Sequence, residues 1–281
     1  MKSKMANLRA FNTIAKKEFK ESVKSKWLVT FAITFFFLAL GVPYIILGAG
    51  GFLPDDYPGM IVGTLVIVAL PLIPLVSLAM SSTSIAGERE TGTIEYLLAQ
   101  PATRTEIYLG KYVGLLAAVV GAMTIGYGTA ELLVFSTNPV FIVQFAYGLM
   151  YSALLAASAL ALGFVVSVVS KTRAGAIGTG LFVWFLIVVI YDVGFLGTLT
   201  ILLDLEPYIL YLVIANPVET TRILAVMHMA ESPLRGELGG QLGYFIREYG
   251  ISAASNMLTL IAIVWVIVPL MVGLLLFRSR D

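Results

Sequence analysis

The 281-residue sequence has no cysteine, one histidine and few charged side chains. Without cysteine there are no disulfides, no thiolate metal site and no cysteine nucleophile, and the lone His228 excludes a zinc site built from several histidines. Charged residues make up 12% of the chain, whereas soluble domains carry about 25%. The chain is therefore too apolar to cover a water-exposed surface or to be disordered, and its net charge of +1 gives no indication of a nucleic-acid partner.

Long apolar stretches are the main feature that is present. Apolar residues make up 59% of the chain, and the mean hydropathy is +0.93. A helix needs about 20 consecutive apolar residues to cross a bilayer. The sequence predicts an all-α membrane protein in which residues 1–281 form one transmembrane domain with six spans, at about 27–50, 60–86, 107–135, 140–170, 174–203 and 252–277.

Basic residues are divided unequally between the two sides of this domain. With six spans both termini share one side, and that side holds 15 of the 18 lysines and arginines, because only Arg222, Arg235 and Arg247 lie opposite. The positive-inside rule then places both termini in the cytoplasm of a multi-pass cell-membrane protein. The other side carries eight acids, which either favour cations near an outer mouth or simply solvate the loops: Asp55, Asp56, Asp204, Glu206, Glu219, Glu231, Glu237 and Glu248.

Residues 1–26 precede the first span and are rich in lysine. Apolar residues recur there every three or four positions, which is the period of one helical face: Leu8, Phe11, Ala15, Phe19, Val23 and Trp27. We expect an amphipathic helix in the cytoplasmic interface of the lipid bilayer, with its lysines near anionic headgroups. The alternative is a lysine cluster that only sets the membrane topology.

The cytoplasmic loop 87–106, between the second and third spans, contains a short predicted helix. Gly92 precedes this helix, and three apolar residues fall on one side of it: Ile94, Leu97 and Leu98. Thr103 and Glu106 have the spacing of a capping box, which starts the helix that enters the membrane. A short helix held between two span ends is suited to bind another protein, and a merely solvated loop is the alternative.

The segment Gly87–Pro101, followed by Arg104, Glu106-Ile107 and Leu109-Gly110-Lys111, resembles the coupling region of the ABC-2 type transporter permeases. The likeness in six spans and an amphipathic entry helix covers nearly the whole chain. It implies a homodimer that contacts two ABC ATPase subunits at the cytoplasmic side. It also implies a role in ATPase coupling for seven residues: Glu88, Arg89, Glu90, Thr93, Glu95, Leu98 and Arg104.

A site for ATP is absent from the sequence in its usual form. No G-x-x-x-x-G-K-[ST] phosphate-binding loop occurs. We therefore expect ATP and Mg²⁺ to bind in a separate ATPase subunit, and we expect no catalytic residue and no resident cofactor in this chain.

A narrower resemblance involves Val183–Leu186, Tyr191-Asp192 and the residues Asn216–Leu224. These residues are similar to those of the subfamily of ABC-2 permeases that serves the maturation of nitrous-oxide reductase, a copper enzyme. The resemblance implies an extracytoplasmic β-helical partner and work on copper-site or sulfur delivery. It leaves the substrate open.

Two acids lie near the outer ends of predicted spans, where a charge is costly to bury. Asp192 follows Tyr191 within a strongly apolar stretch, and Glu131 lies near the outer end of the third span. Each is a candidate gate residue or contact for an outer partner. The alternative is a carboxylate that caps its helix or reaches to the interface.

The outer segment 204–250 begins with an apolar run that ends at Ala215 and is too short to cross, so we expect it to be interfacial or re-entrant. Asn216-Pro217-Val218-Glu219 then has the pattern of a helix start. Farther along, Met227, His228 and Met229 supply thioether and imidazole groups, which suit Cu(I). Successive helical residues point about 100° apart, however, and the alternative is an interfacial helix with one exposed histidine.

Three functions follow from these features. The first is a permease subunit that couples ATP hydrolysis in a separate subunit to export, or to maturation of a copper enzyme outside the membrane. The second is a secondary transporter or channel, which would need ionisable groups at mid-membrane, and the chain has almost none there. The third is a membrane scaffold that assembles an extracytoplasmic enzyme without transport.

Overall fold

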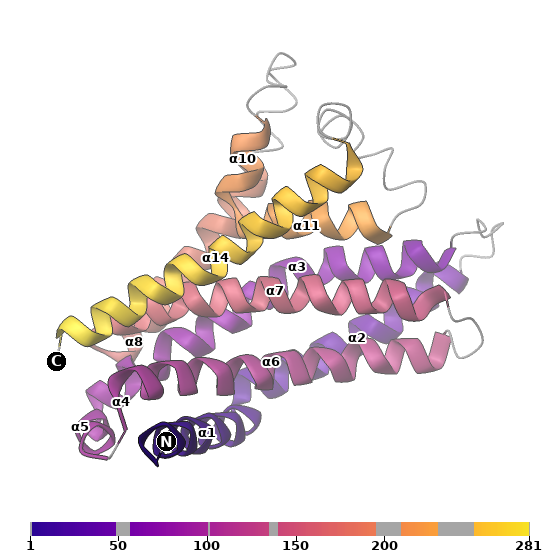
Figure 1. Cartoon of the computed structure of the whole chain (residues 1–281). Coiled ribbons are helices and arrows are strands. Elements are labelled where there is room, and N and C mark those ends of the chain that lie inside the picture. The colour runs from indigo at the N-terminus through magenta and orange to yellow at the C-terminus, as the bar shows by residue number, and fades with distance from the viewer. Residues whose placement is uncertain are drawn as a thin grey trace.

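The computed structural model describes residues 2–48, 57–100, 102–134, 140–194, 209–229 and 250–280. Every regular element within these residues is a helix (Figure 1). In chain order they are α1 (Lys2–Val23), α2 (Lys26–Gly48), α3 (Tyr57–Ser84), α4 (Ala86–Glu90), α5 (Thr93–Leu98), α6 (Arg104–Val134), α7 (Val140–Val169), α8 (Arg173–Phe185), the π-helix η1 (Leu186–Ile190), α10 (Ile209–Ala215), α11 (Pro217–Met229) and α14 (Ile251–Arg280).

Five segments of the described residues are long and apolar enough to cross a membrane: Gly63–Glu90, Arg104–Thr129, Phe145–Val169, Arg173–Gly194 and Ser252–Ser279. A sixth candidate is the pair formed by α1 and α2, which are bent by 63° at the break between Val23 and Lys26. These findings confirm the predicted all-α membrane protein with five to six spans.

The long helices α3 and α7 form the centre of the bundle (Figure 1). Small residues let their backbones approach closely, as is common between membrane helices. A side chain added at Gly163 of α7 would collide with Ser81 of α3, and one at Gly180 of α8 would lie 3.0 Å from the Ser82 hydroxyl. By contrast, α8 and α14 lie at the edge and expose most of their apolar side chains.

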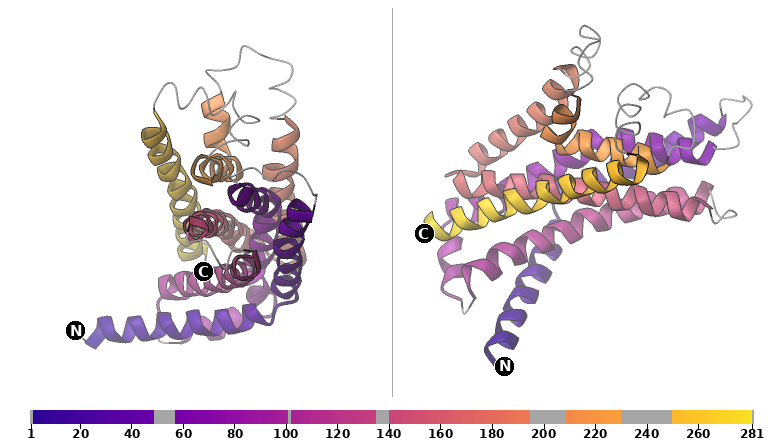
Figure 2. Two further views of the ribbon diagram at one scale, coloured as in Figure 1. Left: turned by 90° about the vertical axis from the view of Figure 1, so that its right-hand side faces the viewer. Right: turned by 45° about the horizontal axis from the view of Figure 1, so that its top comes forward.

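Helix α1 runs across one end of the bundle, away from the direction of the long helices (Figure 2). It packs on the first turns of α6, where Gly114 leaves no room for a side chain beside Ala15 and Glu18. Lys16, Lys17 and Lys20 face outward, as do Phe19 and Val23. The amphipathic helix predicted for residues 1–26 is therefore present, with Glu18 on the face that packs against the protein.

The segment after η1 folds back into the bundle, which the sequence analysis did not foresee. Helix α11 packs against α3, α7, α14 and η1, and Glu219 has only 1% of its surface exposed. The expectation that Glu219 belongs to a solvated outer loop is therefore wrong. The physical reason is that its charge is balanced by Arg222 on the same helix, so that α11 can be buried. Of the two alternatives for α10, a re-entrant segment fits this packing.

Three carbonyls near the end of α10 accept hydrogen bonds from side chains of other elements. The Leu212 carbonyl accepts a hydrogen bond from the hydroxyl of Tyr191, the Val213 carbonyl accepts one of 2.8 Å from Thr220, and the Ile214 carbonyl accepts one of 2.9 Å from the Trp265 indole. Irregular backbone at membrane depth is tolerated only when protein satisfies its polar groups in this way.

Asn216 joins the helix α11 to the π-helix of span five. Its side-chain oxygen accepts a 2.9 Å hydrogen bond from the Val218 amide, which confirms Asn216 as the predicted cap of α11. The side-chain nitrogen Nδ2 of Asn216 donates a 2.6 Å hydrogen bond to the Ile187 carbonyl in η1. Because a π-helix departs from the α-helical hydrogen-bond register, a carbonyl such as that of Ile187 can accept a bond from a neighbouring element.

Candidate functional site

The short helices α4 and α5 lie at the same end of the molecule as α1 and the C-terminus (Figure 1). Helix α4 begins against α7, because the Ser167 hydroxyl accepts hydrogen bonds of 2.8 and 3.0 Å from the amides of Ile85 and Ala86. Gly92 separates α4 from α5 with a φ of 70°, a conformation that glycine adopts without strain. The loop 87–106 is therefore a folded unit that is attached to the bundle.

Arg89 and Glu90 attach α4 to the turn between α7 and α8. The Arg89 guanidinium donates hydrogen bonds of 2.9 and 3.0 Å to the carbonyls of Val168 and Ser170, at the C-terminal end of α7. A cation is favoured at this end by the helix dipole. The Glu90 carboxylate accepts a 2.6 Å hydrogen bond from the Arg173 amide, at the N-terminus of α8.

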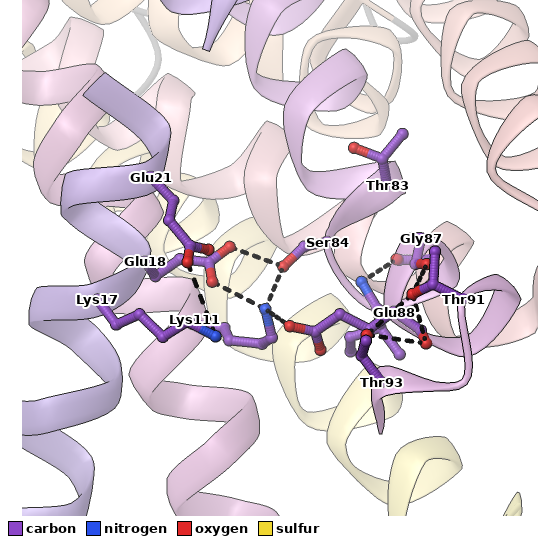
Figure 3. Close-up of polar contacts among 12 residues, drawn as sticks. Lys17, Glu18, Glu21, Thr83, Ser84, Gly87, Glu88, Thr91, Thr93 and Lys111 are labelled. Carbon is purple, nitrogen blue, oxygen red and sulfur yellow. Dashed lines mark hydrogen bonds and ion pairs between the residues drawn. The ribbon is translucent and has the colours of Figure 1, made fainter. Parts of the chain in front are cut away.

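Glu88 is held by Lys111, a buried lysine of α6 (Figure 3). The Lys111 ammonium lies 2.9 Å from Glu88 Oε1 and 2.8 Å from Glu18 Oε2, and it donates a longer bond of 3.4 Å to the Ser84 hydroxyl. The same hydroxyl donates a 3.0 Å hydrogen bond to Glu18. We call Glu18, Lys111 and Glu88 the inner triad. It joins α1, α4 and α6 at one point.

Helix α5 has one face on the bundle and one face exposed. Ile94 is buried and Leu97 and Leu98 are half-buried, as the sequence pattern predicts, whereas Glu95 is exposed and Tyr96 keeps 78% of its surface. A groove of about 500 Å³ separates α5 from α1; its lining is mainly apolar, with Lys17 at its rim: Ala10, Thr13, Ile14, Lys17, Thr93, Tyr96, Leu97, Gln100 and Ala102.

The start of α6 is fixed by the predicted capping box. The Thr103 amide donates a 2.8 Å hydrogen bond to Glu106, and the Glu106 amide donates a 3.3 Å bond to the Thr103 hydroxyl. These two bonds confirm the prediction. Arg104 donates a 3.2 Å hydrogen bond to the Phe277 carbonyl, so it contacts the end of α14.

The seven residues assigned to coupling thus fall into two groups. Glu88, Arg89, Glu90 and Arg104 contact other helices of this chain, and the Thr93 hydroxyl lies 3.3 Å from the Glu88 carbonyl. Leu98 is half-buried, and Glu95 points outward. Their role toward an ATPase remains a prediction. Sequence reasoning gave no role to Tyr96, Ser167, Lys111 or Glu18. Of these, Lys111 could have been found, because it is a charge about one helical turn inside a predicted span.

A second cluster of charges lies toward the other end of α8. Arg222 of α11 is 3.0 Å from Asp192 Oδ2 and 2.7 Å from Glu219 Oε2. Among the described residues, the remaining carboxylate oxygens of Asp192 and Glu219 have no hydrogen-bond partner. We call these three residues the outer triad. Asp192 therefore makes an ion pair inside the protein, which neither alternative of the sequence analysis included, while the side chain of Glu131 lies outside the described residues.

His228 lies in a pocket of aromatic and hydroxyl side chains. Its Nδ1 is 3.0 Å from the Tyr151 hydroxyl and its Nε2 is 3.2 Å from the Ser255 hydroxyl. Met227 is buried, and the side chain of Met229 lies outside the described residues. Both ring nitrogens of His228 lie within hydrogen-bond distance of protein groups, and Cu(I) binding by Met227, His228 and Met229 remains a prediction. The described residues also contain no group of three or more acidic or histidine side chains that could hold a metal.

Comparison with known proteins agrees with this architecture. Residues 12–281 match the family described as ABC-2 family transporter protein. The chain is 29% identical to the probable ABC transporter permease protein NosY of Stutzerimonas stutzeri, over 95% of this chain and 97% of that protein. It is also 29% identical to the protein of the same name in Pseudomonas aeruginosa PAO1, over 75% of this chain and 80% of that protein. The chain therefore belongs to the ABC-2 family of transporter proteins and is a membrane-embedded permease subunit of an ABC transporter.

Proposed function

We propose that separate ABC ATPase subunits move this permease by binding the exposed face of α5. The observation that carries the proposal is the division of this short helix into an inner face, which packs on the bundle, and an outer face with Glu95 and Tyr96. An exposed tyrosine beside an apolar groove is a good anchor for a partner protein, because aromatic residues supply much of the energy of interfaces. The loop 87–106 is then on the cytoplasmic side.

The contacts of α4 explain how such a partner can act on the spans. Arg89 and Glu90 hold α4 to the adjoining ends of α7 and α8, and Glu88 holds it to α6 through Lys111. A push on α5 therefore reaches three spans through hydrogen bonds and ion pairs. In this proposal Glu88, Arg89, Glu90 and Arg104 transmit the movement, whereas Glu95 touches the ATPase.

A second copy of this chain is proposed to cover the exposed face of span five. That face presents large apolar side chains from α8, η1 and the turn that follows: Phe182, Phe185, Leu186, Ile190 and Val193. A dimer built there places two α4–α5 segments side by side for two ATPase subunits. Family membership disfavours a secondary transporter, while a scaffold that moves no substrate remains an outcome of the experiment below.

The process served by the transporter is proposed to be the maturation of a copper enzyme outside the membrane, with an extracytoplasmic β-helical partner. The support is the similarity to two permeases named NosY, together with the subfamily resemblance around Asp192 and Asn216. Whether this chain contacts copper itself through Met227, His228 and Met229 is a separate prediction, which Cu(I) retention by a variant with all three residues replaced would test.

The test uses two tyrosines of equal exposure. Tyr96 on α5 is 78% exposed and Tyr44 on α2 is 79% exposed. We expect Tyr96→Ala combined with Glu95→Arg to prevent co-purification of the ATPase subunits and to abolish the dependence of ATP hydrolysis on the permease. Tyr44→Ala should change neither, because it lies far along α2 from α5. Unchanged ATPase binding and hydrolysis in the α5 variant would contradict the proposal, and hydrolysis without any transported or matured product would favour the scaffold.

A further inference from the structure

The lysine of the inner triad is unusual in its burial. Lys111 has 3% of its surface exposed. It is also a charged residue in α6, which contains one of the candidate membrane spans. An unpaired ammonium is costly to bury, so its two carboxylate partners are what allow it to remain there. One partner, Glu88, belongs to the coupling segment, and the other, Glu18, belongs to α1.

The contact between α1 and α6 is close along its length. The glycines Gly110 and Gly114 of α6 face α1, and added side chains would lie within 3.2 Å of Ile14 and would collide with the backbone at Ala15. The α1 backbone and the side chains of Ile14 and Glu18 thus fit directly against the glycines of α6. Lys111 follows Gly110 directly in the sequence. Its ion pairs with Glu18 and Glu88 therefore join α1 to α4 close to the glycines on which α1 packs.

We propose that Lys111 is a positioning residue that makes α1 part of the coupling machinery, so that the amphipathic helix moves together with α4 and α5. The inference rests on the proposed function for the role of α5, but the joint movement of α1 and α4 is a separate physical claim. In its simplest reading α1 only anchors the chain to the lipid surface. The inner triad gives it a second role, because a displacement of Glu88 is transmitted to Glu18 through one shared ammonium group.

The structural arm of the experiment uses the absence of cysteine from the chain. Nitroxide labels on Lys20→Cys of α1 and Ala99→Cys, both exposed positions, report the separation of α1 from the coupling segment by pulsed electron paramagnetic resonance. We expect one narrow distance distribution in the otherwise unchanged chain and a broad one in Lys111→Met. Lys111→Arg, which keeps the charge, should restore the narrow distribution.

The functional arm measures ATP hydrolysis by the complex that co-purifies with the chain. A triple variant removes all three charges of the inner triad and leaves no carboxylate unpaired: Glu18→Gln, Glu88→Gln and Lys111→Met. It replaces Lys111→Met in both measurements if that single variant fails to fold. We expect this variant to bind the ATPase but to lose at least tenfold in permease-dependent hydrolysis. Glu21→Gln is the matched control, because Glu21 is exposed and, among the residues that the structure describes, forms an ion pair only with Lys17, at 3.7 Å.

The outcomes separate the two proposals. If the triple variant keeps both the narrow distance distribution and full hydrolysis, the role of Lys111 is refuted. If the distribution broadens but hydrolysis is unchanged, the triad is only structural and the inference also fails. If the unchanged chain binds no ATPase, the proposed function fails, whereas the distance measurement still decides whether Lys111 joins α1 to α4.

Discussion

The inner and outer triads have the same pattern of charges but take their residues from different numbers of helices. Each places one cation between two carboxylates: Glu18–Lys111–Glu88 at the α4–α5 end, and Asp192–Arg222–Glu219 toward the other end of α8. The inner triad takes its residues from three helices, whereas the outer triad takes two from one turn of α11. The side chain of Lys111 is 4% exposed and that of Arg222 is 21% exposed. The inner triad therefore fixes three elements, while the outer triad fixes α11 to the end of span five.

This difference suggests different mechanical roles. Opening the inner triad would leave the Lys111 ammonium without a partner, and this is costly because its side chain is only 4% exposed. In the outer triad, Asp192 is 31% exposed on its side chain, and Arg222 keeps Glu219 as a partner when Asp192 moves away. The ion pair between Asp192 and Arg222 of α11 can therefore break at modest cost, whereas breaking the inner triad costs more.

The largest expected effect is on stability, from loss of the inner cation. Lys111→Met leaves Glu18 and Glu88 facing each other without a counter-charge, and breaking a buried ion pair in this way costs about 3–5 kcal/mol of unfolding free energy. Denaturant or thermal unfolding in detergent measures it. Adding Glu18→Gln and Glu88→Gln should recover most of the loss, since a neutral buried cluster is tolerated. If Lys111→Met unfolds at the wild-type midpoint, the contrast between the triads does not hold.

A smaller effect is expected from the outer cation. Arg222→Met leaves one buried carboxylate, Glu219, without its partner, where Lys111→Met leaves two, so we expect a cost of about 3 kcal/mol, at the low end for a broken buried ion pair, while Asp192 turns to water. Hydrogen exchange should increase in α11 and not in α4, because only α11 depends on this contact. Arg222→Lys is the control that keeps the charge. Equal losses of stability from Lys111→Met and Arg222→Met, or increased exchange spread over the whole bundle, would remove the distinction between the two sites.

Local patterns in the sequence predicted much of the fold. The apolar stretches indicated the long helices, Thr103 and Glu106 gave the capping box, and Asn216-Pro217 gave the start of α11. Each of these depends on residues within one or two turns. The inner face of α5 was predictable for the same reason, since Ile94 and Leu98 share one side of a short helix.

The triads could not be predicted, because they depend on contacts between distant segments. Glu18, Glu88 and Lys111 are separated by many residues and belong to three elements. The sequence analysis placed Glu219 and Arg222 in a helix of the outer segment and did not foresee its burial, since charge usually marks a segment outside the membrane. Because the two charges pair with each other, they can be buried inside the bundle. The π-helix η1, whose Ile187 carbonyl accepts a hydrogen bond from the Asn216 side chain, also has no recognisable pattern in the sequence.

The most direct test of the central claim is cross-linking at α5. Tyr96→Cys introduces one thiol into a chain without cysteine, and a thiol-directed photo-cross-linker on it should capture the ATPase subunit in membranes, with the yield changing when ATP is added. The same label on Tyr44→Cys should capture no ATPase. Equal capture from both positions, or none from Tyr96→Cys in a complex that hydrolyses ATP, would contradict the account.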